Sequence, residues 1–287
     1  MNAHGSLPRD WGVGTTGGSE VLGIPVAEEL LARWRDWWAP ERQPFPVGDL
    51  PADQLAALPE GTADPGESDP PSGVITDEVR DSFFVYGGTW RWLTQAQFGA
   101  LPSELRRSLI AARRRWSRTK PAPPWPTHLR AGDEDRLLRW VAAGATPSRH
   151  HEIGESTWSR AATVLPQARN LAGTFADGSG PNCFGTVMAA AGVPGAAEEW
   201  MTQEPFEAWL AATTTKVRGT AYDRDPGVVL LWHEHGELAH AAVTIGDGWA
   251  LSKPSQSWSS PRLVWTTRRT ISSWTYAGTR LSRRRLG

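Results

Sequence analysis

The sequence has little cysteine, little lysine and no long apolar segment. Its single cysteine, Cys183, excludes a framework of intramolecular disulfides. All apolar runs are far shorter than the ~20 residues that a membrane-spanning helix needs, so we expect no membrane partner. Residues 1–20 are polar and glycine-rich, without the basic segment and apolar stretch of a secretory signal. We therefore expect a cytoplasmic protein.

Charge is nearly balanced, and the residue in excess is tryptophan. The formal net charge is −1, so nothing in the overall charge indicates a nucleic acid as partner. The chain has 17 tryptophans. Some of these must lie in the core, and others are candidates for lining a groove, Trp90 and Trp92 in particular.

Residues 1–150 are predicted to form a mainly helical accessory region that is rich in tryptophan. The spacing of apolar residues predicts helices over Val26–Trp38, Ser103–Trp116 and Asp133–Val141. The second of these carries an arginine-rich face, which is either a solvated surface or a site for an anion. A stretch at about 45–75, rich in Pro, Asp, Glu and Gly, is predicted to be a linker. We expect the region to cover or narrow a cleft in the rest of the chain.

Residues 151–287 change in character, with helices first and strands afterwards. A short helix of small residues is predicted over Cys183–Gly192. Apolar and alternating segments predict strands over Val228–Trp232, Leu238–Ile245, Trp249–Lys253, Arg262–Thr266 and Thr270–Tyr276. This order indicates an α+β fold, in which helices pack on an antiparallel sheet.

Cys183 stands where a thiol is readily activated. It follows a turn of glycines and proline, Asp177-Gly-Ser-Gly-Pro-Asn182, and Asn182 is a good N-cap for the helix that starts there. The helix N-terminus lowers a thiol pKa, and the backbone N–H of Cys183 can stabilise an oxyanion. A side chain of the turn, such as Ser179 or Asn182, is a second candidate donor to that oxyanion.

A nucleophilic cysteine needs a base, and His240 is the candidate. It lies inside the alternating strand among small residues, which leaves room above it for the cysteine helix. After the Gly246-Asp247-Gly248 hairpin, Ser252 returns beside the histidine and is the first candidate for a third, orienting residue. Gln256 is a second candidate.

Two other functions fit parts of the sequence. His233, His235 and His240 lie close together and are a candidate metal site, although the segment does not match His-Glu-x-x-His. Alternatively, the tryptophan-rich half binds a ligand, and Cys183 is a buried, unreactive residue.

The motifs around the cysteine and the histidine resemble the NlpC-type branch of the papain-like cysteine peptidases and amidases, which includes the CHAP amidases. The matching segments are Asn182-Cys183-Phe184-Gly185, Pro226-Gly-Val-Val-Leu-Leu-Trp232 and His240-Ala-Ala-Val-Thr-Ile-Gly-Asp-Gly248, with the strand that ends at Lys253. The resemblance covers about residues 158–270, somewhat under half of the chain.

The resemblance implies a papain-like core over 151–287, with Cys183 as nucleophile, His240 as base and Ser252 as the polar third residue. No cofactor is implied. Two positions depart from the family: Asn182 replaces the usual Asp before the nucleophile, and Phe184 replaces the Ser after it. In cell-wall members these positions help to bind the peptide stem, so their change argues against peptidoglycan as substrate.

The sequence therefore predicts a cysteine-dependent hydrolase or acyltransferase that acts on an amide or ester through a thioester intermediate. The expected substrate is a specialised peptide or small amide. The oligomeric state and the acceptor, water or an amine, stay open.

Overall fold

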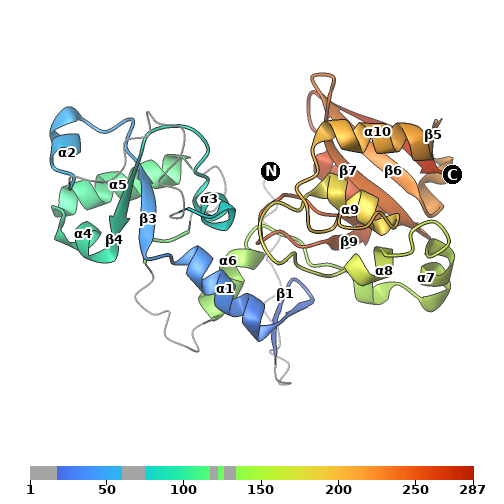
Figure 1. The fold of residues 1–287 in the computed structure, drawn as a ribbon, viewed down its shortest axis with the longest axis horizontal. Coiled ribbons are helices and arrows are strands. Elements are labelled where there is room, and N and C mark those ends of the chain that lie inside the picture. The colour runs from blue at the N-terminus through green and yellow to red at the C-terminus, as the bar shows by residue number, and fades with distance from the viewer. Residues whose placement is uncertain (1–17, 60–74, 117–121, 126–133) are drawn as a thin grey trace, which may run out of the picture.

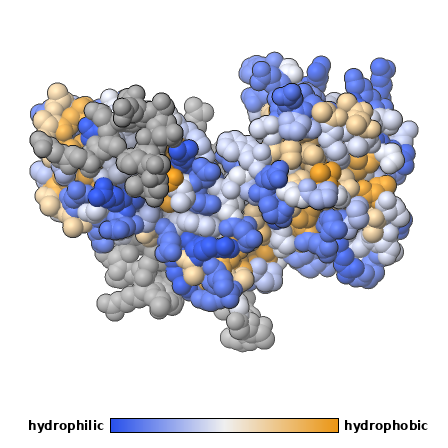
Figure 2. Space-filling model, viewed as in Figure 1, coloured by the Kyte–Doolittle hydropathy of each residue, from blue (hydrophilic) through white to orange (hydrophobic). Residues whose placement is uncertain are grey.

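The computed structural model describes residues 18–59, 75–116, 122–125 and 134–287, arranged in two lobes (Figure 1). The N-terminal lobe is built from short helices and two small β-ribbons, and the C-terminal lobe from helices around one larger sheet. The face seen in Figure 2 is mostly polar, with apolar residues gathered mainly on the C-terminal lobe. The predicted α+β class is confirmed.

A six-stranded antiparallel sheet forms the centre of the C-terminal lobe. Its order is β5-β10-β6-β7-β8-β9, so the last strand of the chain lies between β5 and β6. The strands are β5 (Thr214–Val217), β6 (Val228–Glu234), β7 (Glu237–Gly246), β8 (Trp249–Ser252), β9 (Leu263–Thr266) and β10 (Thr279–Leu286). Each neighbouring pair is antiparallel, as the hairpin turns of the sequence lead us to expect.

Helices cover both faces of this sheet, because alternate residues of its strands are apolar on both sides. On one face, called the α9 face, Val229, Val243 and Ile245 pack against helices α7 (Glu155–Ala161), α8 (Ala168–Leu171), α9 (Cys183–Ala190) and α10 (Gln203–Thr213). On the other, the α11 face, Val228 and Ala242 pack towards α11 (Thr267–Trp274). Two 3₁₀ turns, η1 (His150–Glu152) and η2 (Ala221–Arg224), lie in the connections.

Helix α9 forms where the sequence predicts it, and small residues let it approach its neighbours closely. The Asn182 side chain caps it by accepting a hydrogen bond from the Gly185 N–H at 3.0 Å. A Cβ atom added at Gly185 would lie 2.3 Å from the carbonyl oxygen of Ala196. All eight residues of α9 are buried, so the helix fixes the cysteine rigidly.

One predicted strand is a helix instead. Residues Thr270–Tyr276 were expected to be extended because they are rich in Thr, Ile and aromatics, yet they fall largely within α11. The Thr266 side chain accepts a hydrogen bond from the Arg269 N–H at 3.2 Å and so starts the helix. An N-cap therefore outweighs β-propensity in this segment.

The N-terminal lobe consists of two packed clusters of apolar side chains. Its elements are β1 (Ser19–Val21), β2 (Ile24–Val26), α1 (Glu28–Trp38), β3 (Arg42–Pro46), α2 (Ala52–Ala56), α3 (Asp77–Phe83), β4 (Trp90–Thr94), α4 (Gln95–Ala100), α5 (Ser103–Trp116) and α6 (Asp135–Ala142). The helices predicted over Val26–Trp38, Ser103–Trp116 and Asp133–Val141 correspond to α1, α5 and α6. The arginines of α5 do not all lie on one solvated face. Arg113 is only 2% exposed, and its guanidinium lies over the Phe45 ring at 3.7 Å.

Two expectations for this lobe are wrong. Residues 45–59 are not a linker, because Phe45, Val47 and Leu58 are core residues; 60–74, the rest of the expected linker, lie outside the described residues. Trp90 and Trp92 do not line a groove, since they are 3% and 6% exposed. Both belong to β4, which pairs with β3, and Leu93 on the opposite face of the same strand is buried as well.

The two lobes are joined by Trp258, which belongs to the C-terminal lobe but is buried in the N-terminal core. Its ring lies 5.4 Å from that of Trp34 and 5.6 Å from that of Trp140. Its Nε1 donates to the carbonyl of Glu78 and to the Ser82 hydroxyl, both in α3. The predicted domain boundary at residue 150 therefore separates the helical part of the chain from the sheet. The two parts nevertheless share a core, because Trp258 packs among the residues of the N-terminal lobe.

Candidate functional site

Cys183 is the first residue of α9, and its sulfur meets several backbone donors. The N–H groups of Cys183, Phe184 and Ala241 act on the sulfur and lower the thiol pKa. Burial acts in the opposite direction and is stronger, so the pKa of the thiol rises to about 11. With 9% of its surface exposed, Cys183 rests as a neutral thiol.

Lys253 is a charged residue whose charge acts on this thiol and lowers its pKa. The β7–β8 register pairs Val243 with Leu251, and Lys253 directly follows the end of β8 at Ser252. Lys253 is fully buried, and its Nζ donates to the carbonyls of Ser255 at 2.6 Å and Ser257 at 3.1 Å. Burial and, to a smaller extent, the charge of Arg262 lower the pKa of its amine to about 7, while the charges of Asp81 and Cys183 act to raise it.

Asp81 reaches the same site from α3 of the other lobe. Burial raises the pKa of this carboxyl, whereas hydrogen bonds from Ser179 and Tyr86 and the charge of Lys253 lower it. The Tyr86 hydroxyl donates a short hydrogen bond to one carboxylate oxygen of Asp81. Gln256 donates to the same hydroxyl at 3.5 Å. The half-exposed Tyr86 is therefore hydrogen-bonded to the buried Asp81, whose charge acts on the buried Lys253, and the charge of Lys253 acts in turn on Cys183.

Helix α3 also packs directly on the turn that precedes the cysteine. The Ser179 N–H donates to the Glu78 carboxylate at 3.2 Å, and a Cβ atom at Gly178 would lie 2.5 Å from that same carboxylate. The Ser179 hydroxyl accepts from the Trp258 N–H at 3.1 Å. Helix α3 of the N-terminal lobe thus lies against the turn before Cys183; that residues 1–150 cover or narrow a cleft stays a prediction.

Four of the six predicted site residues come together here. Cys183 and Asn182 start α9, Ser179 lies in the preceding turn, and Gln256 lies in the segment after β8. Asn182 does not face a substrate position: its Oδ1 caps the helix and its Nδ2 donates to the Met201 carbonyl at 2.7 Å. Its role in the structure is to hold α9 in place.

His240 and Ser252, by contrast, do not lie beside Cys183, so the predicted Cys–His pair is not assembled. His240 is on the α11 face, where its ring stacks on Trp274 with centroids 3.7 Å apart. Cys183 packs on the opposite face, with Ala241 and Val243. The expected register of His240 and Ser252 is correct, since their side chains form a hydrogen bond of 3.0 Å. Burial lowers the pKa of the histidine to about 3.

Strand parity explains the error. Neighbouring residues of a strand point to opposite faces, and the more apolar set, Val243 and Ile245, faces the helices. Ala241 belongs to that set, so it points at Cys183 and its neighbour His240 points away.

The alternative metal site is not assembled either. His233 lies on the α9 face, His240 on the α11 face, and His235 in the turn between β6 and β7 with a φ of 53°. Across the described residues, no group of three His, Cys, Asp or Glu side chains is arranged to hold a metal ion.

Sequence reasoning missed Lys253, Asp81 and Tyr86. Lys253 offered a signal, because it is one of three lysines and directly follows an apolar strand, where a charged residue is normally exposed. Asp81 and Tyr86 offered none, since they lie about 100 residues from the cysteine in sequence and are brought to it by the docking of α3.

A scan of protein-family models and searches of curated proteins and of solved structures each find no match to this chain. In the described part of the chain, no helix has the length and apolar character needed to cross a membrane.

Proposed function

We propose that this protein is a cysteine-dependent hydrolase or acyltransferase of amides or esters, in which Lys253 takes the place of His240 as the base for Cys183. The observation that carries the proposal is the fully buried amine of Lys253, with a pKa of about 7, electrostatically coupled to a cysteine at a helix N-terminus. A buried lysine with such a pKa is typical of functional sites, because burial disfavours its charged form.

The chemistry follows from the resting protonation states. The neutral Nζ of Lys253 accepts the thiol proton as the sulfur of Cys183 attacks the carbonyl carbon of the substrate. The Lys253 ammonium then gives this proton to the leaving amine or alcohol, and a thioester remains on Cys183. Water or an acceptor amine loses a proton to Lys253 and attacks the thioester, the acid or amide product leaves, and the Lys253 ammonium returns the proton to the Cys183 thiolate.

Asp81 acts in this proposal as a positioning residue. Its negative charge raises the pKa of the Lys253 amine, opposing the effect of burial, and so keeps it near neutral pH. The order of elements, a helix carrying the nucleophile and then antiparallel strands, supports a papain-like architecture for the C-terminal lobe as part of the same proposal. The C-terminal lobe departs from that architecture at Ala241, which faces Cys183 at the place where the resemblance implies a histidine.

The test is acylation of the native protein by p-nitrophenyl acetate between pH 5 and 10. We expect a burst of p-nitrophenol and an acetyl group on Cys183, at a rate that rises as pH passes about 7 and Lys253 becomes neutral. Lys253→Met should lower this rate by about 10²-fold or more, in the range of a lost general base, and remove the inflection near 7.

Two variants serve as controls. Cys183→Ala should prevent acetylation at position 183, and His240→Gln should leave the rate and its pH profile unchanged, because His240 lies on the other face of the sheet. Acylation of Lys253→Met at the wild-type rate would exclude Lys253 as the base.

A second candidate is a binding module in which this polar cluster only joins the lobes. It is favoured by the low exposure of Cys183 and by the two carbonyls that Lys253 already satisfies. Under this candidate Cys183 stays unacetylated in the folded wild-type protein.

A further inference from the structure

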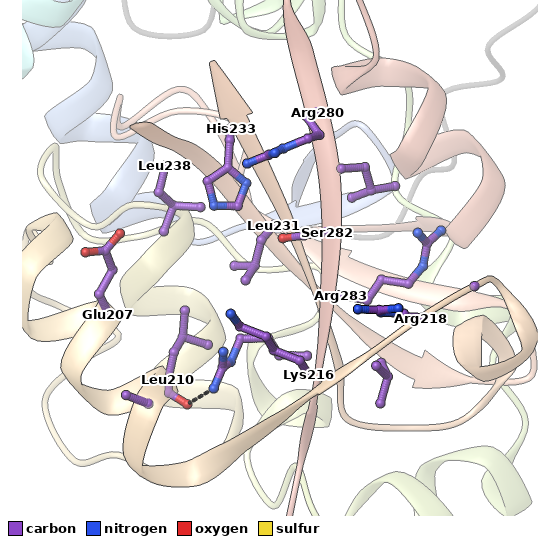
Figure 3. A pocket seen from close by; sticks show the side chains of 15 residues that line it. Glu207, Leu210, Lys216, Arg218, Leu231, His233, Leu238, Arg280, Ser282 and Arg283 are labelled. Carbon is purple, nitrogen blue, oxygen red and sulfur yellow. Dashed lines mark hydrogen bonds between the residues drawn. The ribbon is translucent and has the colours of Figure 1, made fainter. Parts of the chain in front are cut away.

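A second site lies on the α9 face of the sheet, away from Lys253. It is a cavity of about 600 Å³ between α10 and the strands β5, β10 and β6 (Figure 3). This volume is in the range of small-molecule sites.

The walls of the cavity carry several cations. Lys216 and Arg284 stand directly opposite each other on β5 and β10, and Arg280 stands opposite His233 on β10 and β6. Arg218 follows β5 at the rim. Like charges placed directly opposite across a sheet, as Lys216 and Arg284 are, destabilise it, so an anion bound between these two cations would stabilise the sheet.

Little in the protein neutralises this charge. Arg283 forms an ion pair with Asp223 at 2.6 Å, but in the described part of the chain the side chains of Lys216, Arg218 and Arg280 form no ion pair or hydrogen bond. Arg284 donates to Thr214 and to the Leu210 carbonyl, which orients its guanidinium without adding a negative charge. Among the described residues that line the cavity, Glu207 is the single one with a carboxylate.

His233 supplies an unused donor or acceptor at the same place. Its Nδ1 is buried and has no hydrogen-bond partner among the described residues. Figure 3 shows the Arg280 side chain reaching towards the His233 ring, at one end of the cavity. A buried polar atom without a partner is costly, and a ligand oxygen at this point would satisfy it.

The floor of the cavity is apolar. Leu210, Leu231 and Leu238 line it and are each less than 9% exposed, so the floor is firmly packed. A ligand that fits both parts has an anionic group for the cations and an apolar body for the leucines.

We propose that this cavity binds an organic phosphate, a phosphate monoester with an apolar body of about nucleotide size. Guanidinium groups match the oxygens of a phosphate in pairs, and a lysine adds a point charge to the dianion. The proposal is independent of the site at Cys183, because it uses none of the residues of that site.

The test measures binding of 1-naphthyl phosphate to the full chain by calorimetry, with 1-naphthol and inorganic phosphate as the two halves of the ligand. We expect saturable binding of the ester at least tenfold tighter than that of either half. The double variant Lys216→Glu with Arg280→Glu should weaken it by tenfold or more.

Arg107→Glu is the matched control, because Arg107 is an exposed arginine on α5, in the other lobe. It should leave the affinity unchanged. Equal affinity for 1-naphthol and its phosphate, absence of saturable binding, or equal effects of the pocket variant and Arg107→Glu would each overturn the proposal.

Discussion

Burial sets the chemistry of the ionisable residues in this protein, and it does so differently on the two faces of one sheet. Lys253 and His240 are both buried bases whose pKa values are lowered, to about 7 and about 3. His240 stacks on Trp274 and bonds Ser252, so it behaves as a neutral core residue. Lys253 instead interacts through its charge with Asp81 and Cys183, and the proposed function assigns its lowered pKa to proton transfer.

The lowered pKa of Lys253 has a consequence for stability. Between pH 7 and about 10.5 the unfolded chain holds a proton on this amine that the folded protein lacks, so the stability rises with pH across that window. The contribution is fully present above 10.5 and is lost as pH falls to 7, at up to about 1.4 kcal/mol per pH unit.

We therefore expect Lys253→Met to be at least as stable as the wild type at pH 7, and to lose this advantage as pH rises to 9. Urea denaturation at pH 7, 8 and 9 measures the difference. Lys216→Met, a change of an exposed lysine, should show no such trend. A lysine that stabilises the fold through its charge would give the opposite order, with Lys253→Met the weaker protein at pH 7.

At the scale of elements, close packing around α9 explains why the cysteine is held so firmly. Gly185→Ala would place a Cβ atom 2.3 Å from the Ala196 carbonyl oxygen, which is backbone and cannot swing away. We expect this change to destabilise the protein by about 1–3 kcal/mol, as overpacking does, and to lower its Tm.

The matched control for this prediction is Gly99→Ala in α4, where an added Cβ atom meets nothing within 4 Å. Since alanine favours a helix over glycine, that variant should be neutral or more stable by about 0.5–1 kcal/mol. Equal effects of the two substitutions on Tm would contradict the packing argument.

The elements show what the sequence does and does not determine. Helix α5 and the start of α9 are predicted closely, because apolar spacing defines α5 locally and the Asn182 cap defines the start of α9. The partner of Cys183 is not predicted correctly, because a shift of one residue along the strand decides whether Ala241 or His240 faces the cysteine. Asp81 depends on the docking of two lobes, and no local pattern encodes that contact.

At the scale of the whole molecule, the Trp258 side chain holds the N-terminal lobe over the candidate site. Its ring fills the core formed by Trp34, Trp37 and Trp140, and its Nε1 bonds α3 directly. The same helix supplies Asp81 and lies on the Ser179 turn. Under the proposed function, access of a reagent or substrate to Cys183 would therefore depend on the contact between the lobes.

Removing this contact should expose the thiol. We expect Trp258→Ala to destabilise the protein by about 3–5 kcal/mol, the usual cost of removing a buried tryptophan, and to raise the rate at which Ellman's reagent labels Cys183 in the folded protein by about tenfold. Labelling is measured at pH 8, under conditions in which circular dichroism shows the variant folded. Trp200→Ala, at a tryptophan that is 62% exposed, controls for the loss of an indole. A labelling rate in Trp258→Ala equal to that of the wild type would show that α3 does not limit access, and that the thiol is protected by the packing of α9 alone.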